Sequence, residues 1–174
     1  MRAKVNSQLE KLWRKHGAHE FGKICQILLC FCLVRLQFRI QIFQLSGRPD
    51  IVAIRDQEKF AFEVKTQSVS EATIKPEDID GVKNYPEHAI ISVLSYPDLD
   101  CSWVLTKADD IKAGKWPISF LKQHSIPSLE RELNEVFPRV LEEYLSYADL
   151  GTTVLYEKLD EVLNLEKSRK SSNQ

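Results

Sequence analysis

The stretch from Gly47 to Gln67 reads GRPDIVAIRDQEKFAFEVKTQ, and it decides how the rest of the chain is interpreted. Two short apolar runs, 50–55 and 60–66, are separated by the polar residues DQEK, which predicts a β-hairpin. Asp50 opens the first run, directly after a proline, and Glu63 and Lys65 lie in the second. Asp, Glu and Lys are all depleted in β-strands, so three of them in one hairpin need a physical reason.

The alternation of side chains along a strand places these charges together. If DQEK forms the turn, facing residues have numbers that sum to 115, so Asp50 lies opposite Lys65 and Val52 lies opposite Glu63. Asp50, Glu63, Lys65 and Gln67 then project from one face. The opposite face is apolar and would join a core: Ile51, Ala53, Phe60, Phe62 and Val64.

Two carboxylates and an ammonium group at one end of a hairpin have two interpretations. Carboxylate oxygens suit Mg²⁺ or Mn²⁺, so Asp50 and Glu63 are candidate metal ligands, with the backbone carbonyl of Val64 as a third oxygen. A metal there would lower the pKa of its bound water and neutralise charge on a phosphate, while Lys65 would help to position that water. Without a metal, the same residues form an ordinary salt-bridge network, Asp50–Lys65–Glu63.

The pattern resembles the PD-(D/E)xK nuclease superfamily, which has the restriction-endonuclease-like fold. Pro49-Asp50 and Glu63-Val64-Lys65 match its motif residue for residue. The resemblance implies an α/β protein with a mixed β-sheet flanked by helices, and here with a helical C-terminal extension. It also implies a Mg²⁺- or Mn²⁺-dependent endonuclease that acts on DNA, with Asp50, Glu63 and Lys65 as catalytic residues.

Many members of this superfamily carry a further glutamate on the preceding helix, and Glu20 occupies that place here. The resemblance therefore implies Glu20 as a catalytic residue and third metal ligand. The alternative for Glu20 is an acid in the first turn of a helix, where the helix dipole favours it. Gly81, not glutamine, precedes Tyr85 by four residues, so the additional motif of the RecB-like exonuclease branch is not met.

The resemblance covers residues 18–107, and it divides the chain into two parts. Residues 1–107 are expected to form the nuclease-like core, and residues 108–174 a helical extension with a disordered tail from about residue 168. Apolar spacing predicts the remaining elements. They are a helix from Ser7 that Gly17 ends, a buried helix 18–34, strands 36–42, 89–96 and 101–107, turns at 46–47 and 97–100, a helix from Pro76, and two C-terminal helices, the first kinked or divided at Pro138.

The distribution of charge suits a phosphate-rich partner at the front of the chain. Residues 1–65 hold 12 Lys and Arg against 6 Asp and Glu, whereas residues 66–174 hold 12 against 19. Arg48, Lys15, Lys23 and Gln67 are the expected nucleic-acid contacts. The two tryptophans at 103 and 116 are expected in the core, not as surfaces on which bases stack.

The four cysteines form no CxxC pair, which favours reduced, buried residues in an intracellular, cytoplasmic protein. A zinc site from Cys30 and Cys32 with His16 or His19 has the wrong spacing. The apolar run 24–34 is about half the length of a membrane span, so no membrane partner is expected.

The sequence is also compatible with two other functions. The first is a non-catalytic protein of the same fold that binds nucleic acid or organises a larger complex. The second is an interaction module whose C-terminal helices dimerise while the charges serve only the structure. A homodimer is also expected for the nuclease, since it would suit cleavage of two strands.

Overall fold

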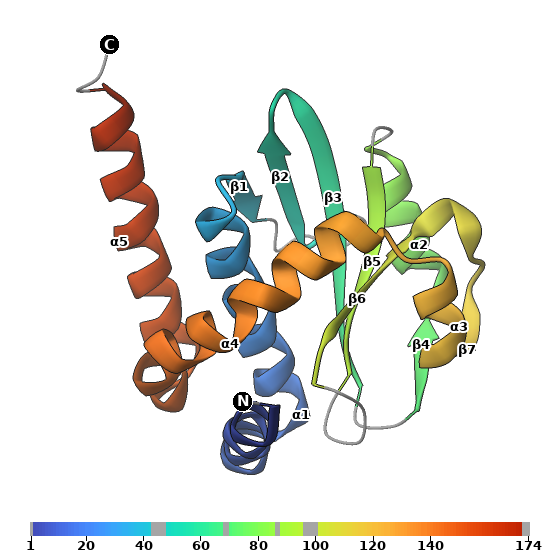
Figure 1. The fold of residues 1–174 in the computed structure, drawn as a ribbon, viewed down its shortest axis with the longest axis horizontal. Helices are drawn as coiled ribbons and strands as arrows, with labels where there is room; N and C mark the ends of the chain where they lie inside the picture. Colours follow the sequence, from blue (N-terminus) through green and yellow to red (C-terminus); the bar gives the residue numbers. More distant parts are fainter. Residues whose placement is uncertain (1, 43–47, 68–69, 86–87, 96–100, 172–174) are drawn as a thin grey trace.

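The computed structural model describes residues 2–42, 48–67, 70–85, 88–95 and 101–171, without the side chains of Arg2, Gln67 and residues 166–171 (Figure 1). The expected turns at 46–47 and 97–100 lie outside the described residues. The elements in chain order are α1 (Arg2–Arg35), β1 (Arg39–Ile42), β2 (Ile51–Arg55), β3 (Glu58–Gln67), β4 (Glu71–Ile74), α2 (Pro76–Lys83), β5 (His88–Ser95), β6 (Trp103–Lys107), a 3₁₀ turn η1 (Ala108–Asp110), β7 (Gly114–Pro117), α3 (Ile118–Gln123), α4 (Pro127–Leu150) and α5 (Thr152–Ser171).

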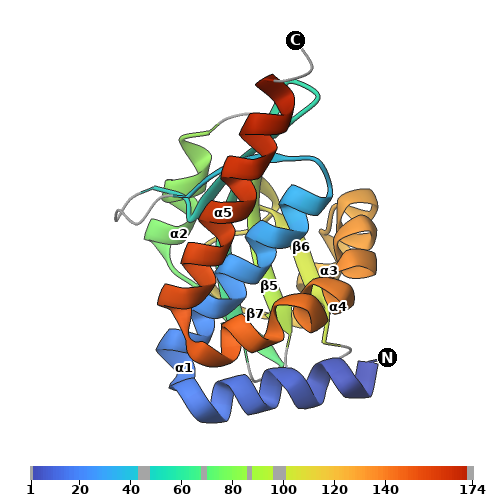
Figure 2. The same cartoon turned by 90° about the vertical axis from the view of Figure 1, so that its left-hand side faces the viewer.

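A five-stranded mixed sheet forms the centre, in the order β1-β2-β3-β5-β6. Among the strands that the structure describes, only β3 and β5 pair in parallel, and α2 lies in the connection between them. The sheet separates two hydrophobic clusters, one shared with α1, α4 and α5 and the other with α2, α3 and the small β4–β7 sheet. Figures 1 and 2 show these two groups on opposite sides of the sheet. The expected architecture, a mixed sheet flanked by helices with a helical C-terminal part, is confirmed.

The long helix α1 is broken at Gly17, whose φ of 75° and ψ of 169° are not helical. Glycine adopts a positive φ without the steric cost that a side chain brings. The helix changes direction at this break (Figure 2), as the sequence predicted. By length and hydropathy, one window within residues 3–35 would pass as a membrane span, but 61% of that window is buried inside the fold. Its apolar residues therefore belong to the core, as expected of residues 24–34.

The β2–β3 hairpin differs from the prediction in its register. Asp56 and Gln57 form the tip with φ values of 53° and 74°, which is the geometry of a two-residue type I′ turn. Ile51 therefore faces Phe62, and Arg55 faces Glu58. Facing numbers sum to 113 instead of 115, so the predicted pairing was wrong by two residues. A shift of two residues keeps every side chain on its face, whereas a shift of one would have exchanged the faces.

Other elements also differ from the expectations. β1 begins at 39 instead of 36, and the pairing of β4 with β7 was not predicted. α4 is not divided at Pro138, and α5 extends to Ser171, beyond the start of the expected disordered tail. Packing contacts join residues on either side of residue 107, since β7 pairs with β4 and α4 shares a hydrophobic cluster with α1.

One helix covers the outer edge of the sheet. The side chain of Asn134 in α4 accepts a hydrogen bond from the Trp103 N–H and donates one to the Trp103 carbonyl, each at 2.8 Å. Glu130 accepts the Leu105 N–H at 2.9 Å, and the Ile126 N–H donates to the Leu105 carbonyl at 2.9 Å. An exposed edge strand can pair with another chain, so these contacts protect β6 from that outcome.

Candidate metal and phosphate site

The candidate site forms where β2 and β3 stop pairing. Their ladder ends at Ile51 and Phe62, but β3 continues to residue 67 and pairs on its other edge with β5. Asp50 lies directly before β2, and its Oδ2 accepts a hydrogen bond from the Val64 N–H at 2.8 Å. The carboxylate of Asp50 thus takes the place of a strand partner for β3.

Lys65 lies between two carboxylates. Its Nζ is 2.8 Å from Glu63 Oε1 and 2.8 Å from Asp78 Oδ1. The three side chains are only 21%, 12% and 7% exposed, so these ion pairs are largely shielded from water. The expected salt bridge between Glu63 and Lys65 is present, and the second partner of Lys65 is a residue that the sequence analysis missed.

Asp78 is held by the start of α2. Its Oδ2 accepts the Lys75 backbone N–H at 2.8 Å, which satisfies a group at the helix N-terminus. The other oxygen remains directed at Lys65. The sequence Pro76-Glu77-Asp78 correctly predicted where the helix starts. The contact of the Asp78 carboxylate with Lys65 depends on how α2 packs on the sheet, which the sequence does not reveal.

A glycine allows that packing. A Cβ atom added at Gly81 would lie 3.4 Å from the carbonyl carbon and oxygen of Arg48, so α2 approaches the backbone just before Pro49 and Asp50 closely. α2 therefore contacts the segment that carries Asp50 while it presents Asp78 to Lys65. One helix thus supports both halves of the site.

The electrostatics of the site favour a bound cation. Burial, and then the nearby charge of Asp50, raise the pKa of Glu63 to about 8. Burial also raises the pKa of Asp50, although the Val64 N–H and Lys65 partly offset this. Burial alone would lower the pKa of Lys65, but its hydrogen bonds to Asp78 and Glu63 outweigh burial and raise it. Three carboxyl groups share one ammonium group, so the cluster carries excess negative charge when all are ionised.

The donor set fits a hard divalent cation that keeps several of its waters. Mg²⁺ is bound in proteins through one or two carboxylates together with water and substrate oxygens, and Asp50 and Glu63 provide two such groups. In a strand, the N–H and C=O of a residue point to the same edge, so the Val64 carbonyl faces the edge at which Asp50 accepts the Val64 N–H. Within the described part of the chain, no three or more His, Cys, Asp or Glu side chains are grouped to hold a metal without such additional ligands.

Glu20 lies elsewhere in the described structure. Its Oε1 accepts two hydrogen bonds from Thr152, one from the backbone N–H at 2.9 Å and one from the hydroxyl at 2.6 Å. Thr152 is the first residue of α5, so Glu20 caps that helix. These hydrogen bonds lower the pKa of Glu20. Among the described residues, Glu20 does not join Asp50 and Glu63 in a group of three side chains that could hold a metal.

The expected nucleic-acid contacts are scattered. Arg48 is exposed beside the motif, and Lys23 is exposed on α1. Lys15 forms an ion pair with Asp149 of α4 at 2.6 Å, away from the hairpin. Gln67 ends β3, but its side chain lies outside the described part. All four cysteines are free and buried, as expected, and the described residues form no zinc site.

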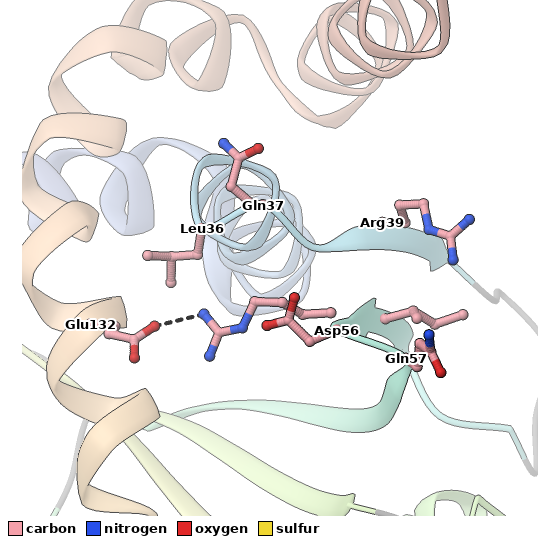
Figure 3. Close-up of a pocket in the computed structure, with 8 residues that line it drawn as sticks. Leu36, Gln37, Arg39, Asp56, Gln57 and Glu132 are labelled. Atoms are coloured by element: carbon pink, nitrogen blue, oxygen red, sulfur yellow. Dashed lines mark hydrogen bonds and ion pairs between the residues drawn. The ribbon is translucent and has the colours of Figure 1, made fainter. Parts of the chain in front are cut away.

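A pocket of about 460 Å³ lies at the other end of the hairpin (Figure 3). The turn residues Asp56 and Gln57 line it, together with residues at the end of α1 and the start of β1. There Arg55 forms an ion pair with Glu132 at 2.7 Å, and its guanidinium carbon lies 4.4 Å from the centre of the Phe38 ring. This contact joins the hairpin tip to α4, and it is separate from the candidate site.

No family model and no curated protein matches this chain. Among solved structures, the chain is similar to Hjc, a Holliday junction resolvase from Archaeoglobus fulgidus, an archaeal hyperthermophile. The identity is 16%, the match covers 59% of this chain and 89% of that chain, and the TM-score is 0.49. A likeness at this level assigns neither a family nor an activity.

Proposed function

We propose that this protein is a Mg²⁺- or Mn²⁺-dependent nuclease that hydrolyses phosphodiester bonds in DNA as an endonuclease inside the cell. The observation that carries this proposal is the arrangement of Asp50, Glu63 and Lys65 on one face of the sheet, where β2 and β3 separate. The motif spacing that carries the family resemblance supports the same activity.

The side chains have distinct roles in this proposal. Asp50, Glu63 and the Val64 carbonyl would hold the cation, which supplies a bound water of lowered pKa and positive charge for the phosphate. Lys65 would donate hydrogen bonds to a phosphate oxygen and to the attacking water. Asp78 would hold the Lys65 ammonium group in place through their 2.8 Å ion pair. We assign Glu20 no role in this proposal, because its Oε1 accepts two hydrogen bonds from Thr152 at the start of α5.

The proposal includes a homodimer, since two copies would cut two strands. Two large apolar side chains of the C-terminal helices support it, because Leu150 is 69% and Leu165 60% exposed. Light scattering after size exclusion would measure the mass, with a Leu165→Glu variant expected to shift a dimer to monomer. A monomeric parent protein would contradict the proposed dimer but not the proposed nuclease activity.

The test is cleavage of supercoiled plasmid and of a labelled branched DNA with Mg²⁺, with Mn²⁺ and with a chelator. Cleavage is expected only with metal, and Asp50→Ala and Glu63→Ala should abolish it. Glu77→Ala is the matched control, because Glu77 is exposed on α2 and pairs only loosely with Lys75 at 3.8 Å. Cleavage that persists in both site variants would contradict the proposal.

A second candidate is a non-catalytic DNA-binding protein of the same fold. It is favoured by the hydrogen bonds that Glu20 accepts from Thr152 and by the ion pairs of Lys65 with two acids. DNA binding by the parent protein without cleavage in any metal would select this function.

A further inference from the structure

Three neighbouring aromatic rings, two of them stacked and the third tilted, lie on the α2 side of the sheet and are called the stack below. The Trp116 ring of β7 stacks on Phe120 of α3, with centroids 4.6 Å apart and an interplanar angle of 18°. Phe120 in turn contacts the His124 ring at 4.5 Å and 40°. All three side chains are only partly buried. The three residues are spaced four apart in the sequence, and this spacing could have revealed that they lie together. The sequence analysis had instead expected Trp116 in the core.

The stack is held in position. The Trp116 Nε1–H donates to the Lys112 carbonyl at 2.7 Å, which fixes the plane of the indole. Trp116 and Phe120 pack against the buried cluster beneath them. By contrast, Trp103 is fully buried and contacts Phe137, as expected of a core residue. A partly exposed ring that is fixed on one side offers its remaining surface at little entropic cost.

Lysines outnumber acids in the segment that carries the rings, although Glu71 of β4 faces Pro117 next to Trp116. Residues 107–124 contain four lysines and two aspartates, within an otherwise acidic C-terminal region. Lys112 and Lys115, which shortly precede Trp116, are exposed, and so is Lys107, whose backbone N–H donates to the His124 carbonyl at 3.4 Å. The acids are Asp109, which pairs with Lys83 at 3.4 Å, and its neighbour Asp110.

The stack also lies on the same side of the sheet as the candidate site. Trp116 pairs with Ala72 of β4, and β4 leads directly into α2. α2 carries Asp78, which contacts Lys65. Adjoining elements on one side of the sheet therefore connect the stack to the candidate site.

We propose that Trp116, Phe120 and His124, with the flanking lysines, bind a single-stranded segment of DNA. Unpaired bases stack on aromatic rings, and lysines neutralise the phosphates between them. Duplex DNA buries its base faces and offers the rings nothing to stack on. The surface itself goes beyond the proposed function, because binding needs no metal; the choice of DNA over RNA rests on that function.

The test is fluorescence anisotropy of a short labelled oligothymidine, with a matched duplex and an oligouridine, all in chelator so that no cleavage occurs. Trp116→Leu should weaken binding of oligothymidine about tenfold. Trp116→Phe should stay close to the parent protein because it keeps a ring. Trp13→Leu is the control, since Trp13 is 40% exposed on α1 and far along the chain from the stack. Lys115→Gln should reduce the salt dependence of binding.

Equal affinity of Trp116→Leu and parent protein would overturn the proposal, as would tighter binding of duplex or of oligouridine. Circular dichroism of each variant separates lost binding from lost folding, and Trp116→Phe remains informative where the leucine variant is unstable. Because binding is measured in chelator, it needs neither metal nor cleavage. A nuclease proposal that fails would therefore leave the binding result intact, and a stack that does not bind would leave the nuclease proposal intact.

Discussion

Lys65 and Asp78 are thirteen residues apart in the chain, and their charged atoms lie 2.8 Å apart across the boundary between β3 and α2. The same Lys65 ammonium group is 2.8 Å from Glu63, so it has a defined position before any substrate binds. A catalytic group that is already placed loses less freedom when the substrate arrives. Asp78, which the motif does not include, is therefore expected to help to position Lys65 for catalysis.

Asp78→Asn should lower the rate constant for cleavage of bound DNA by about 10- to 100-fold, because the neutral side chain still caps α2 but no longer attracts Lys65. KM should change little, since Asp78 would not contact the substrate. Single-turnover cleavage over a range of DNA concentrations separates the two effects. Asp80→Asn on the exposed side of α2 is the control, and equal rates in both variants would remove the positioning role of Asp78.

Divalent metal should stabilise the folded protein through Asp50 and Glu63. A ligand at one hundred times its Kd adds about 2.7 kcal/mol to the free energy of unfolding. We expect Mg²⁺ or Mn²⁺ to raise the Tm of the parent protein. The same metals should leave the Tm of the double variant, Asp50→Asn with Glu63→Gln, unchanged. Thermal melts with and without chelator measure this effect. A metal-dependent shift of the same size in the double variant would place the cation elsewhere.

Glu20→Gln should lower stability by about 1 kcal/mol, because it weakens the cap of α5. Cleavage per folded molecule should stay unchanged. A double-mutant cycle with Thr152→Val, followed by urea denaturation, measures the coupling between the two side chains. Loss of cleavage without loss of stability would instead give Glu20 the catalytic role that the family resemblance implies.

The stability that the Glu20–Thr152 cap provides depends on pH, and the lowered pKa of Glu20 gives the direction. The pKa of Glu20 is lowered in the folded state, first by the Thr152 hydroxyl and then by its backbone N–H. Its contribution to stability is therefore complete above the ordinary pKa of glutamate and is lost as the pH falls through the lowered value. Unfolding free energies across this acidic range should decrease more steeply in the parent protein than in Glu20→Gln. Parallel curves would show that the cap carries no charge-dependent stability.

Asn134→Ala should destabilise the protein by about 2–4 kcal/mol, since it removes two hydrogen bonds and leaves the backbone groups of Trp103 unpaired. Hydrogen exchange at the Trp103 amide should accelerate more than exchange elsewhere in β6. Glu135→Gln, which is exposed on the same helix, should have neither effect. An unchanged Trp103 amide in the alanine variant would show that water replaces the side chain without cost.

The sequence predicted the charged face of the hairpin but not its register, and the difference has a physical cause. Side chains alternate with a period of two, so Asp50, Glu63 and Lys65 share a face in either of two registers separated by two residues. Asp56 and Gln57 are a weaker signal for a type I′ turn than Asn-Gly, so the tip was placed one residue too late.

Contacts between segments far apart in the chain could not be predicted from the sequence pattern. Glu20 meets Thr152 across 132 residues, and no local spacing reveals such a partner. β4 and β7 have four residues each and are separated by α2, β5 and β6, so neither carries enough alternation to be recognised as a strand. Asp78 was visible as a residue at the start of a helix, but its second role depends on packing.

The protection of β6 by α4 has a consequence for how this chain is made. A ribosome releases the strand 103–107 before Glu130 and Asn134, the residues that close its outer edge. For that interval the nascent chain carries an open edge, which favours pairing with other chains. A premature stop between residues 108 and 126 would make that state permanent. Such truncated products should accumulate as aggregates instead of as soluble fragments.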